Sequence, residues 1–168
     1  MLNINSKFVI DRSANHCHLT EEHLELLFGK NRLMQLKPLA IEGEFATDLK
    51  VTDEKGNSYT VLQPCREYSQ IEVAMSDYYK LFKTYTERVS SGDVANAETL
   101  RVRGISTSLV DIPTIVVTPH VHINSELDVM LIPDLKFPFP LSVKINNTTD
   151  LMSHIHLDTD QYAALQGY

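Results

Sequence analysis

Histidines recur in this chain at a spacing of two residues. Six of the seven form His-x-His pairs: His16 with His18, His120 with His122, and His154 with His156. Residues two positions apart on a β-strand lie on the same face, so each pair would present two imidazoles side by side. Neutral imidazole is the commonest protein ligand of zinc, and zinc sites take three or four ligands from separate segments. Together with a carboxylate, the pairs predict one or two zinc sites.

The alternative is that these histidines are half-buried strand residues whose ring nitrogens are hydrogen-bonded to the backbone. For a single pair this would be the better explanation. A metal has the advantage that it accounts for all three pairs together.

Composition narrows the classes of function. The 168 residues suffice for one domain or for two small lobes that share a core. The formal charge is -7 and no basic run occurs, which argues against a nucleic acid or an anionic membrane as partner. No stretch reaches the roughly 20 apolar residues of a membrane span, and the N-terminus lacks the apolar centre of a signal peptide. We therefore expect a cytoplasmic protein.

The cysteines offer little chemistry on their own. Cys17 and Cys65 are too few for a disulfide framework, and they lack the C-x-x-C spacing of a zinc knuckle or redox motif. Both are expected to be small buried residues, although Cys17 lies between two candidate ligands.

Short strands dominate the expected secondary structure. Residue patterns predict strands at 7–12, 15–19, 45–51, 58–62, 68–73, 110–117 and 141–145, with a hairpin turn at 53–57. Thr20 can cap a helix that ends at Gly29, and Ser76 can cap a second one. Residues 84–98 are a loop candidate, and the proline-rich segment 133–140 cannot be a regular interior strand. The predicted class is mainly β.

One arrangement occurs twice. A strand with a His pair, a polar cap and a short helix follow one another at 15–29, and again at 120–131 with Asn124 as the cap. This repetition suggests two related lobes.

Five segments, taken in order, resemble those of the PduL-type phosphotransacylases, also called phosphate propanoyltransferases. Residues 13–20, S-A-N-H-C-H-L-T, are similar to S-A-R-H-V-H-L-S, and residues 37–46, K-P-L-A-I-E-G-E-F-A, to K-P-L-S-x-x-G-x-F-A. Residues 64–72, P-C-R-E-Y-S-Q-I-E, resemble P-x-R-K-x-T-Q-V-E. The S-G-D at 91–93 matches a family loop, and H-L-D-T-D at 156–160 resembles H-I-D-T-D. The resemblance therefore spans nearly the whole chain.

This resemblance implies two small β-barrel lobes with short capping helices and an active site in the cleft between them. Residues 1–35 with 107–168 would form the first lobe, and residues 36–106 the second. Two zinc ions per chain would lie in the cleft. By matching motif, one zinc would be held by His16 and His18, and the other by Glu72, His120, His122 and His156. Three histidines and one carboxylate form a ligand set that suits zinc.

The resemblance also implies where the substrates would bind. Arg66 would hold phosphate with its two-pronged guanidinium group. On the residues alone, a surface ion pair with Glu67 or Glu72 is an equal alternative. The phosphate and thioester would further be lined by Ser13, Ser91 and Gly92, although Ser91 would otherwise read as an ordinary loop serine.

Four positions depart from the family pattern. Asn15 stands where the family usually has an arginine, and Lys144 is the nearest counterpart of a second arginine. The lysine ammonium group is a compact point charge and cannot bind phosphate through two parallel hydrogen bonds as a guanidinium group does, so phosphate affinity would be weaker. His154 is an additional histidine that would share a strand face with His156. His23 matches no family ligand and is expected to face solvent.

The implied reaction is reversible transfer of a short acyl group, acetyl or propanoyl, between coenzyme A and inorganic phosphate. Phosphate on Arg66 would attack the thioester carbonyl directly while zinc polarises that carbonyl. Two other functions stay open. One is a zinc-dependent hydrolase of an ester or phosphate. The other is a noncatalytic zinc- or coenzyme A-binding protein, which the missing arginines favour.

Assembly and location are also implied by the resemblance. Family members that work inside bacterial microcompartments carry an N-terminal targeting extension, and here the first strand is expected to begin within about seven residues of Met1. We therefore expect a free cytoplasmic enzyme. A homodimer is expected by resemblance, and acetyl and propanoyl differ by one methylene, too little for the sequence to decide.

Overall fold

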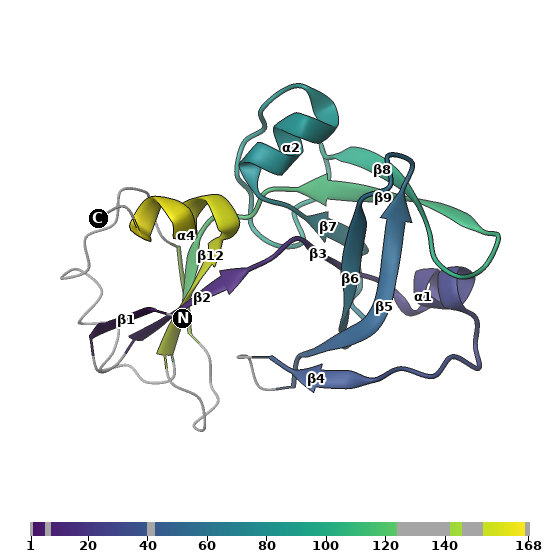
Figure 1. The fold of residues 1–168 in the computed structure, drawn as a ribbon, viewed down its shortest axis with the longest axis horizontal. Coiled ribbons are helices and arrows are strands. Elements are labelled where there is room, and N and C mark those ends of the chain that lie inside the picture. Colours follow the sequence, from purple (N-terminus) through teal and green to yellow (C-terminus); the bar gives the residue numbers. More distant parts are fainter. Residues whose placement is uncertain (1, 6–7, 40–42, 124–141, 146–152, 167–168) are drawn as a thin grey trace. The chain divides into compact units, whose positions relative to one another are not determined.

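A computed structural model describes residues 2–5, 8–39, 43–123, 142–145 and 153–166, and it divides the chain into two compact units (Figure 1). The first unit joins Met1–Ala14 to Val117–Tyr168, and the second is the continuous segment Asn15–Val116. Residues 16–28 contribute to the hydrophobic core of the second unit. The predicted lobes, 1–35 with 107–168 and 36–106, stay predictions.

Six strands of the second unit close into a barrel. They are β3 (His16–His18), β5 (Phe45–Asp53), β6 (Ser58–Gln63), β7 (Gln70–Glu72), β8 (Glu98–Arg103) and β9 (Leu109–Ile115). Their order is β5-β6-β3-β7-β9-β8, and the pairing of β8 with β5 closes the ring. A short strand, β4 (Leu36–Pro38), pairs with β5 outside the ring. The mainly β class with a small barrel is thereby confirmed.

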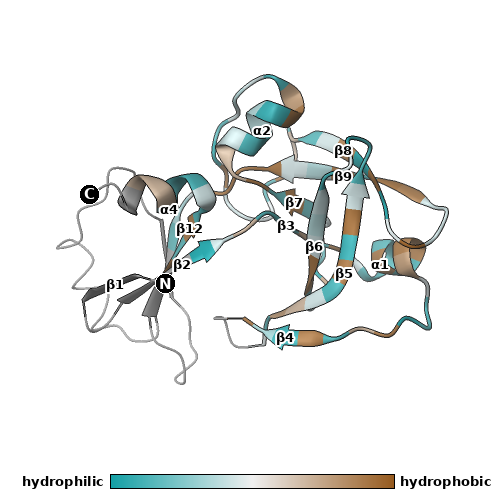
Figure 2. Ribbon diagram, in the orientation of Figure 1, coloured by the Kyte–Doolittle hydropathy of each residue, from teal (hydrophilic) through white to brown (hydrophobic). Residues whose placement is uncertain are grey.

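The barrel interior is filled by alternate residues of its strands. Figure 2 shows hydrophilic and hydrophobic stretches interleaved along β5, as expected for a strand with one face in the core. Fully buried residues from the strands include Cys17, Val51, Val61, Ile71, Val102 and Ile112. Strand β8 was not predicted, because only Val102 of its six residues is buried and the alternation is therefore weak.

Two helices accompany the barrel, α1 (Glu21–Phe28) and α2 (Met75–Phe82). The predicted cap of α1 is confirmed: the Thr20 hydroxyl accepts from the amide of His23 at 3.1 Å, and Gly29 ends the helix at φ 84°. The predicted cap of α2 is wrong. That helix begins after Ala74, whose methyl side chain cannot cap it. Asn15, from a distant segment, accepts from the Ala74 amide at 3.0 Å.

The first unit contains a five-stranded sheet. Its strands are β1 (Leu2–Asn5), β2 (Phe8–Ser13), β10 (His120–Ile123), β11 (Ser142–Ile145) and β12 (Ser153–Asp158), in the order β1-β2-β12-β10-β11. Helix α4 (Thr159–Gln166) follows β12. The helix predicted after Asn124 and the proline-rich segment 133–140 lie outside the described residues. A second barrel and a cleft between lobes stay predictions.

None of the helices in the described residues has the length and apolar character that a membrane crossing requires.

Candidate metal and anion site

The pairing of β3 with β7 brings the first His pair to a carboxylate. The two strands are antiparallel, with His16 opposite Glu72 and His18 opposite Gln70. Between these positions, Cys17 and Ile71 point into the barrel core. Because side chains alternate along a strand, His16, His18 and Glu72 lie together on the other face.

The spacing of their polar atoms fits a metal ion. The Nε2 atoms of His16 and His18 are 3.2 Å apart, and Glu72 Oε2 is 3.0 Å from His18 Nε2 and also in contact with His16 Nε2. Around a tetrahedral zinc with N and O ligands at about 2.0–2.1 Å, neighbouring ligand atoms are separated by about 3.3 Å. The three side chains therefore converge as zinc ligands would.

Burial and neighbouring groups shift the pKa values of His18 and Glu72. Burial lowers the pKa of His18, with the Glu72 carboxylate opposing that effect. Burial alone would raise the pKa of Glu72, but the charges and hydrogen bonds of His16 and His18 outweigh it and hold that pKa well below its usual range. A neutral imidazole and an ionised carboxylate are the forms that bind zinc.

The position of Glu72 corrects one expectation. The resemblance grouped Glu72 with His120, His122 and His156, whereas the structure puts it beside His16 and His18. The physical reason is the β3–β7 register, which makes Glu72 the cross-strand neighbour of His16.

Strands β10 and β12 carry the other two His pairs in the first unit. Strands β10 and β12 are antiparallel, with His120 opposite His156 and His122 opposite His154. The rings of His120 and His156 lie 5.0 Å apart, and Ser13 Oγ is 3.2 Å from His156 Nδ1. His120 Nδ1 lies 3.1 Å from the Thr118 carbonyl oxygen, which can only accept, so Nδ1 is the donor in this contact.

Arg66 is held by a hydroxyl and a carboxylate. Its Nη1 donates to Ser91 Oγ at 2.9 Å, and its Nη2 donates to Glu44 Oε1 at 3.2 Å. Arg66 thus forms an ion pair, as the alternative expected, but among the described residues its partner is Glu44 rather than Glu67 or Glu72. The Arg66 side chain is 36% exposed, which leaves it accessible to an anion.

The loop that carries Ser91 is a tight turn. Asp93 N donates to the Ser90 carbonyl at 3.0 Å, and Gly92 has a φ of 91°, a conformation that favours glycine. The side chain of Gln70 on β7 anchors this turn, since it contacts both Ser91 Oγ and the amide of Gly92 at 2.8 Å. Of the predicted residues, Ser91 therefore contacts Arg66, and Gly92 follows it in the same turn.

Sequence reasoning missed Glu44 and Gln70. Gln70 stands two residues before Glu72, a spacing that predicts a shared strand face, so its position was open to inference from the sequence. Nothing local singles out Glu44, which reaches Arg66 from 22 positions away.

The candidate metal ligands and Arg66 interact electrostatically. The positive charge of Arg66 adds to the lowering of the His18 pKa, after the larger effects of burial and the His16 charge. One region of the second unit therefore combines a candidate metal site with a cation that can hold a phosphate.

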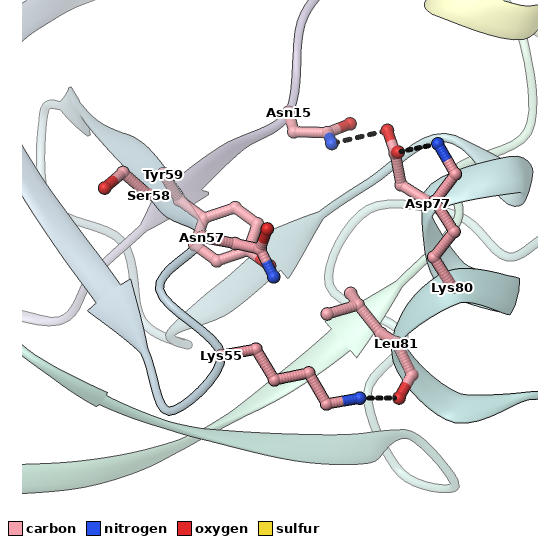
Figure 3. Close-up of a pocket in the computed structure, with 8 residues that line it drawn as sticks. All are labelled: Asn15, Lys55, Asn57, Ser58, Tyr59, Asp77, Lys80 and Leu81. Atoms are coloured by element: carbon pink, nitrogen blue, oxygen red, sulfur yellow. Dashed lines mark hydrogen bonds and ion pairs between the residues drawn. The ribbon is translucent and has the colours of Figure 1, made fainter.

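Asn15, which departs from the family pattern, has a structural role here. Its Nδ2 donates to Asp77 at 2.7 Å (Figure 3). Its Oδ1 accepts from the Ala74 amide, so both ends of the Asn15 amide connect the start of β3 to α2. It also lines a pocket whose other members are Lys55, Asn57, Ser58, Tyr59, Asp77, Lys80 and Leu81.

Two further expectations were tested. His23 does not simply face solvent, because its ring bonds the Ser69 hydroxyl. Both cysteines have their thiol pKa raised by burial, Cys17 strongly and Cys65 less so. Burial therefore favours the neutral thiol at both positions, although Cys65 is only partly buried.

Comparison with known proteins yields one consistent family. The model of the phosphate propanoyltransferase family matches residues 9–134. The phosphate propanoyltransferase of Leptotrichia buccalis is 33% identical over 124 residues, which cover 71% of this chain and 59% of that protein. That of Lachnoclostridium phytofermentans is 27% identical over 169 residues, covering 89% and 78%, and that of Planctopirus limnophila is 40% identical over 88 residues, covering 49% and 36%. The chain thus spans about three fifths of the length of the Leptotrichia relative.

Proposed function

Because this chain belongs to the phosphate propanoyltransferase family, we propose that it is a phosphotransacylase. It would transfer a short acyl group reversibly between coenzyme A and inorganic phosphate, with acyl phosphate and free coenzyme A as the products of the forward direction. The observation that carries the proposal is the combination of Arg66 and Ser91 with the His16, His18 and Glu72 cluster in one unit.

Arg66 would bind the phosphate. Its guanidinium group carries five donors in a planar fork, and two of them contact Ser91 and Glu44. A phosphate dianion would compete with the Glu44 carboxylate for the fork while the contact with Ser91 is kept. A bidentate phosphate is the stronger partner because of its higher charge.

His16, His18 and Glu72 would hold a zinc ion, which when bound supplies a Lewis acid that polarises the thioester carbonyl. His120, His122 and His156 would hold a second ion. The contact of His120 Nδ1 with the Thr118 carbonyl supports this, since it orients the ring as outer contacts orient metal-binding histidines. Ser13 contacts His156 and would have the same orienting role.

Direct attack of phosphate on the thioester needs no covalent acyl enzyme. Holding both substrates converts a bimolecular encounter into an intramolecular one, which removes much of the entropic barrier. The raised thiol pKa of Cys65 supports this route over a cysteine nucleophile. Acyl preference and a homodimeric state stay predictions.

The test is thioester formation from coenzyme A and acetyl phosphate. Zinc-replete protein is compared with chelated protein, with Arg66→Ala, and with Arg101→Ala as a control, because Arg101 forms an exposed ion pair with Asp111 on β8 and β9. We expect zinc-dependent turnover that collapses in Arg66→Ala and persists in the control. Bound zinc without any thioester would refute the enzyme and favour a noncatalytic binding protein, whereas loss of acyl phosphate without thioester would favour a hydrolase.

A further inference from the structure

Gln70 is a polar side chain buried in the anion site. It is 1% exposed, it stands opposite His18 on the neighbouring strand, and it shares a strand face with Glu72. Burying an amide is costly unless its polar atoms are hydrogen-bonded. Both ends of the Gln70 amide are bonded, and both bonds go to the turn that carries Ser91.

The orientation of this amide follows from its partners. The backbone N–H of Gly92 can only donate, so the atom of Gln70 that faces it at 2.8 Å is the carbonyl Oε1. The opposite end, Nε2, therefore faces Ser91 Oγ at 2.8 Å and donates to it.

Ser91 thus receives two donors. Gln70 Nε2 donates to its Oγ, and Arg66 Nη1 donates to the same atom at 2.9 Å. A hydroxyl oxygen has two lone pairs, and both are occupied by these bonds. Neither partner can accept the hydroxyl hydrogen, so it must point to a third group. Among the described residues, the Ser91 hydroxyl donates no hydrogen bond.

We infer that Gln70 is a positioning residue that fixes the Ser91 hydroxyl as a hydrogen-bond donor toward a phosphate bound at Arg66. This inference rests on the proposed function. Phosphate is the acceptor because the group that would bind it, Arg66, donates to the same Oγ. The same contacts exclude Ser91 as a nucleophile, since its attacking lone pairs are engaged.

A double-mutant cycle tests the inference. Gln70→Met, Ser91→Ala and the double variant are compared by the Kd for inorganic phosphate, measured calorimetrically on zinc-loaded full-length protein, and by kcat and KM for phosphate. Losing one donor to an anion weakens binding about tenfold or more, so each single variant is expected to lose that much. If Gln70 acts through Ser91, the double variant is no worse than Ser91→Ala alone.

Gln70→Glu distinguishes orientation of the Ser91 hydroxyl from simple anchoring of the turn through Gly92. It also provides a test if Gln70→Met does not fold. Glutamate keeps the acceptor for Gly92 but cannot donate, so the Ser91 hydrogen turns toward it and phosphate affinity falls. Gln70→Glu also adds a negative charge. The loss of phosphate affinity that this charge causes by itself is measured by making Gln70→Glu in the Ser91→Ala variant. The inference is overturned by independent, additive losses, or by a Gln70→Glu variant that binds phosphate as the parent does. A parent protein that binds no phosphate would instead overturn the proposed function, and this inference with it.

Discussion

The sharpest prediction concerns Glu72, the carboxylate of the His16 and His18 cluster. In Glu72→Gln the side chain keeps its length and one oxygen, but the charge that attracts a cation is lost. Glu72 supplies one of three converging ligand atoms and the only negative charge among them. Substitution of residues that hydrogen-bond to the ligands of a zinc site weakens zinc binding by about 10- to 100-fold. Loss of a direct ligand is therefore expected to weaken it by at least about 100-fold.

That loss converts into a thermal shift. With free zinc at about 100 times the parent Kd, binding stabilises the parent by about 2.7 kcal/mol, and a 100-fold weaker site retains only about 0.4 kcal/mol. The difference of about 2.3 kcal/mol corresponds to a Tm that is lower by about 5–9 °C for a chain of this size.

The assay is the Tm with and without zinc, combined with zinc competition against a chromophoric chelator. The zinc-induced shift is the quantity to compare, because Glu72→Gln also removes a buried charge from the metal-free protein. Glu98→Gln, at the exposed start of β8, is the matched control and should keep the full shift. If Glu72→Gln retains the parental zinc shift and affinity, the assignment of these residues as metal ligands is wrong.

Three further predictions follow from single contacts. Glu44→Gln removes the carboxylate that competes for Arg66, and since such part-exposed pairs are worth about 0.5–1 kcal/mol, KM for phosphate should fall about two- to fivefold. Asn15→Ala loses the amide contacts with α2, which should lower unfolding free energy by about 2 kcal/mol in a denaturant titration. Burial favours the neutral thiol of Cys65, so native alkylation should need a higher pH than free cysteine, and Cys17 should stay unlabelled.

Each has a result that would contradict it. Glu67→Gln is the control for charge alone, and an equal fall of KM in that variant would deny Glu44 a specific role. Parental stability of Asn15→Ala would show that its contacts with α2 are unimportant. Rapid labelling of Cys65 at neutral pH, or lost turnover in Cys65→Ala, would reopen a thiol mechanism.

Much of this protein was determined by local sequence. The His-x-His spacing put two imidazoles on one strand face, Thr20 and Gly29 bounded α1, and the turn at 53–57 joined β5 to β6. These features depend on alternation, capping and turn geometry, which act over a few residues and can therefore be inferred from a single sequence.

Only the tertiary structure decided which residues share the site. Glu72 contacts His16 through a strand register that links segments 56 positions apart. Likewise, Glu44 accepts from Arg66, and Asn15 accepts from the Ala74 amide at the start of α2. Such contacts depend on how the barrel closes, because closure sets register and brings distant side chains together. No local pattern encodes that closure. The His pairs therefore predicted a metal site, whereas only the fold brought Glu72 to His16 and His18 as a candidate third ligand.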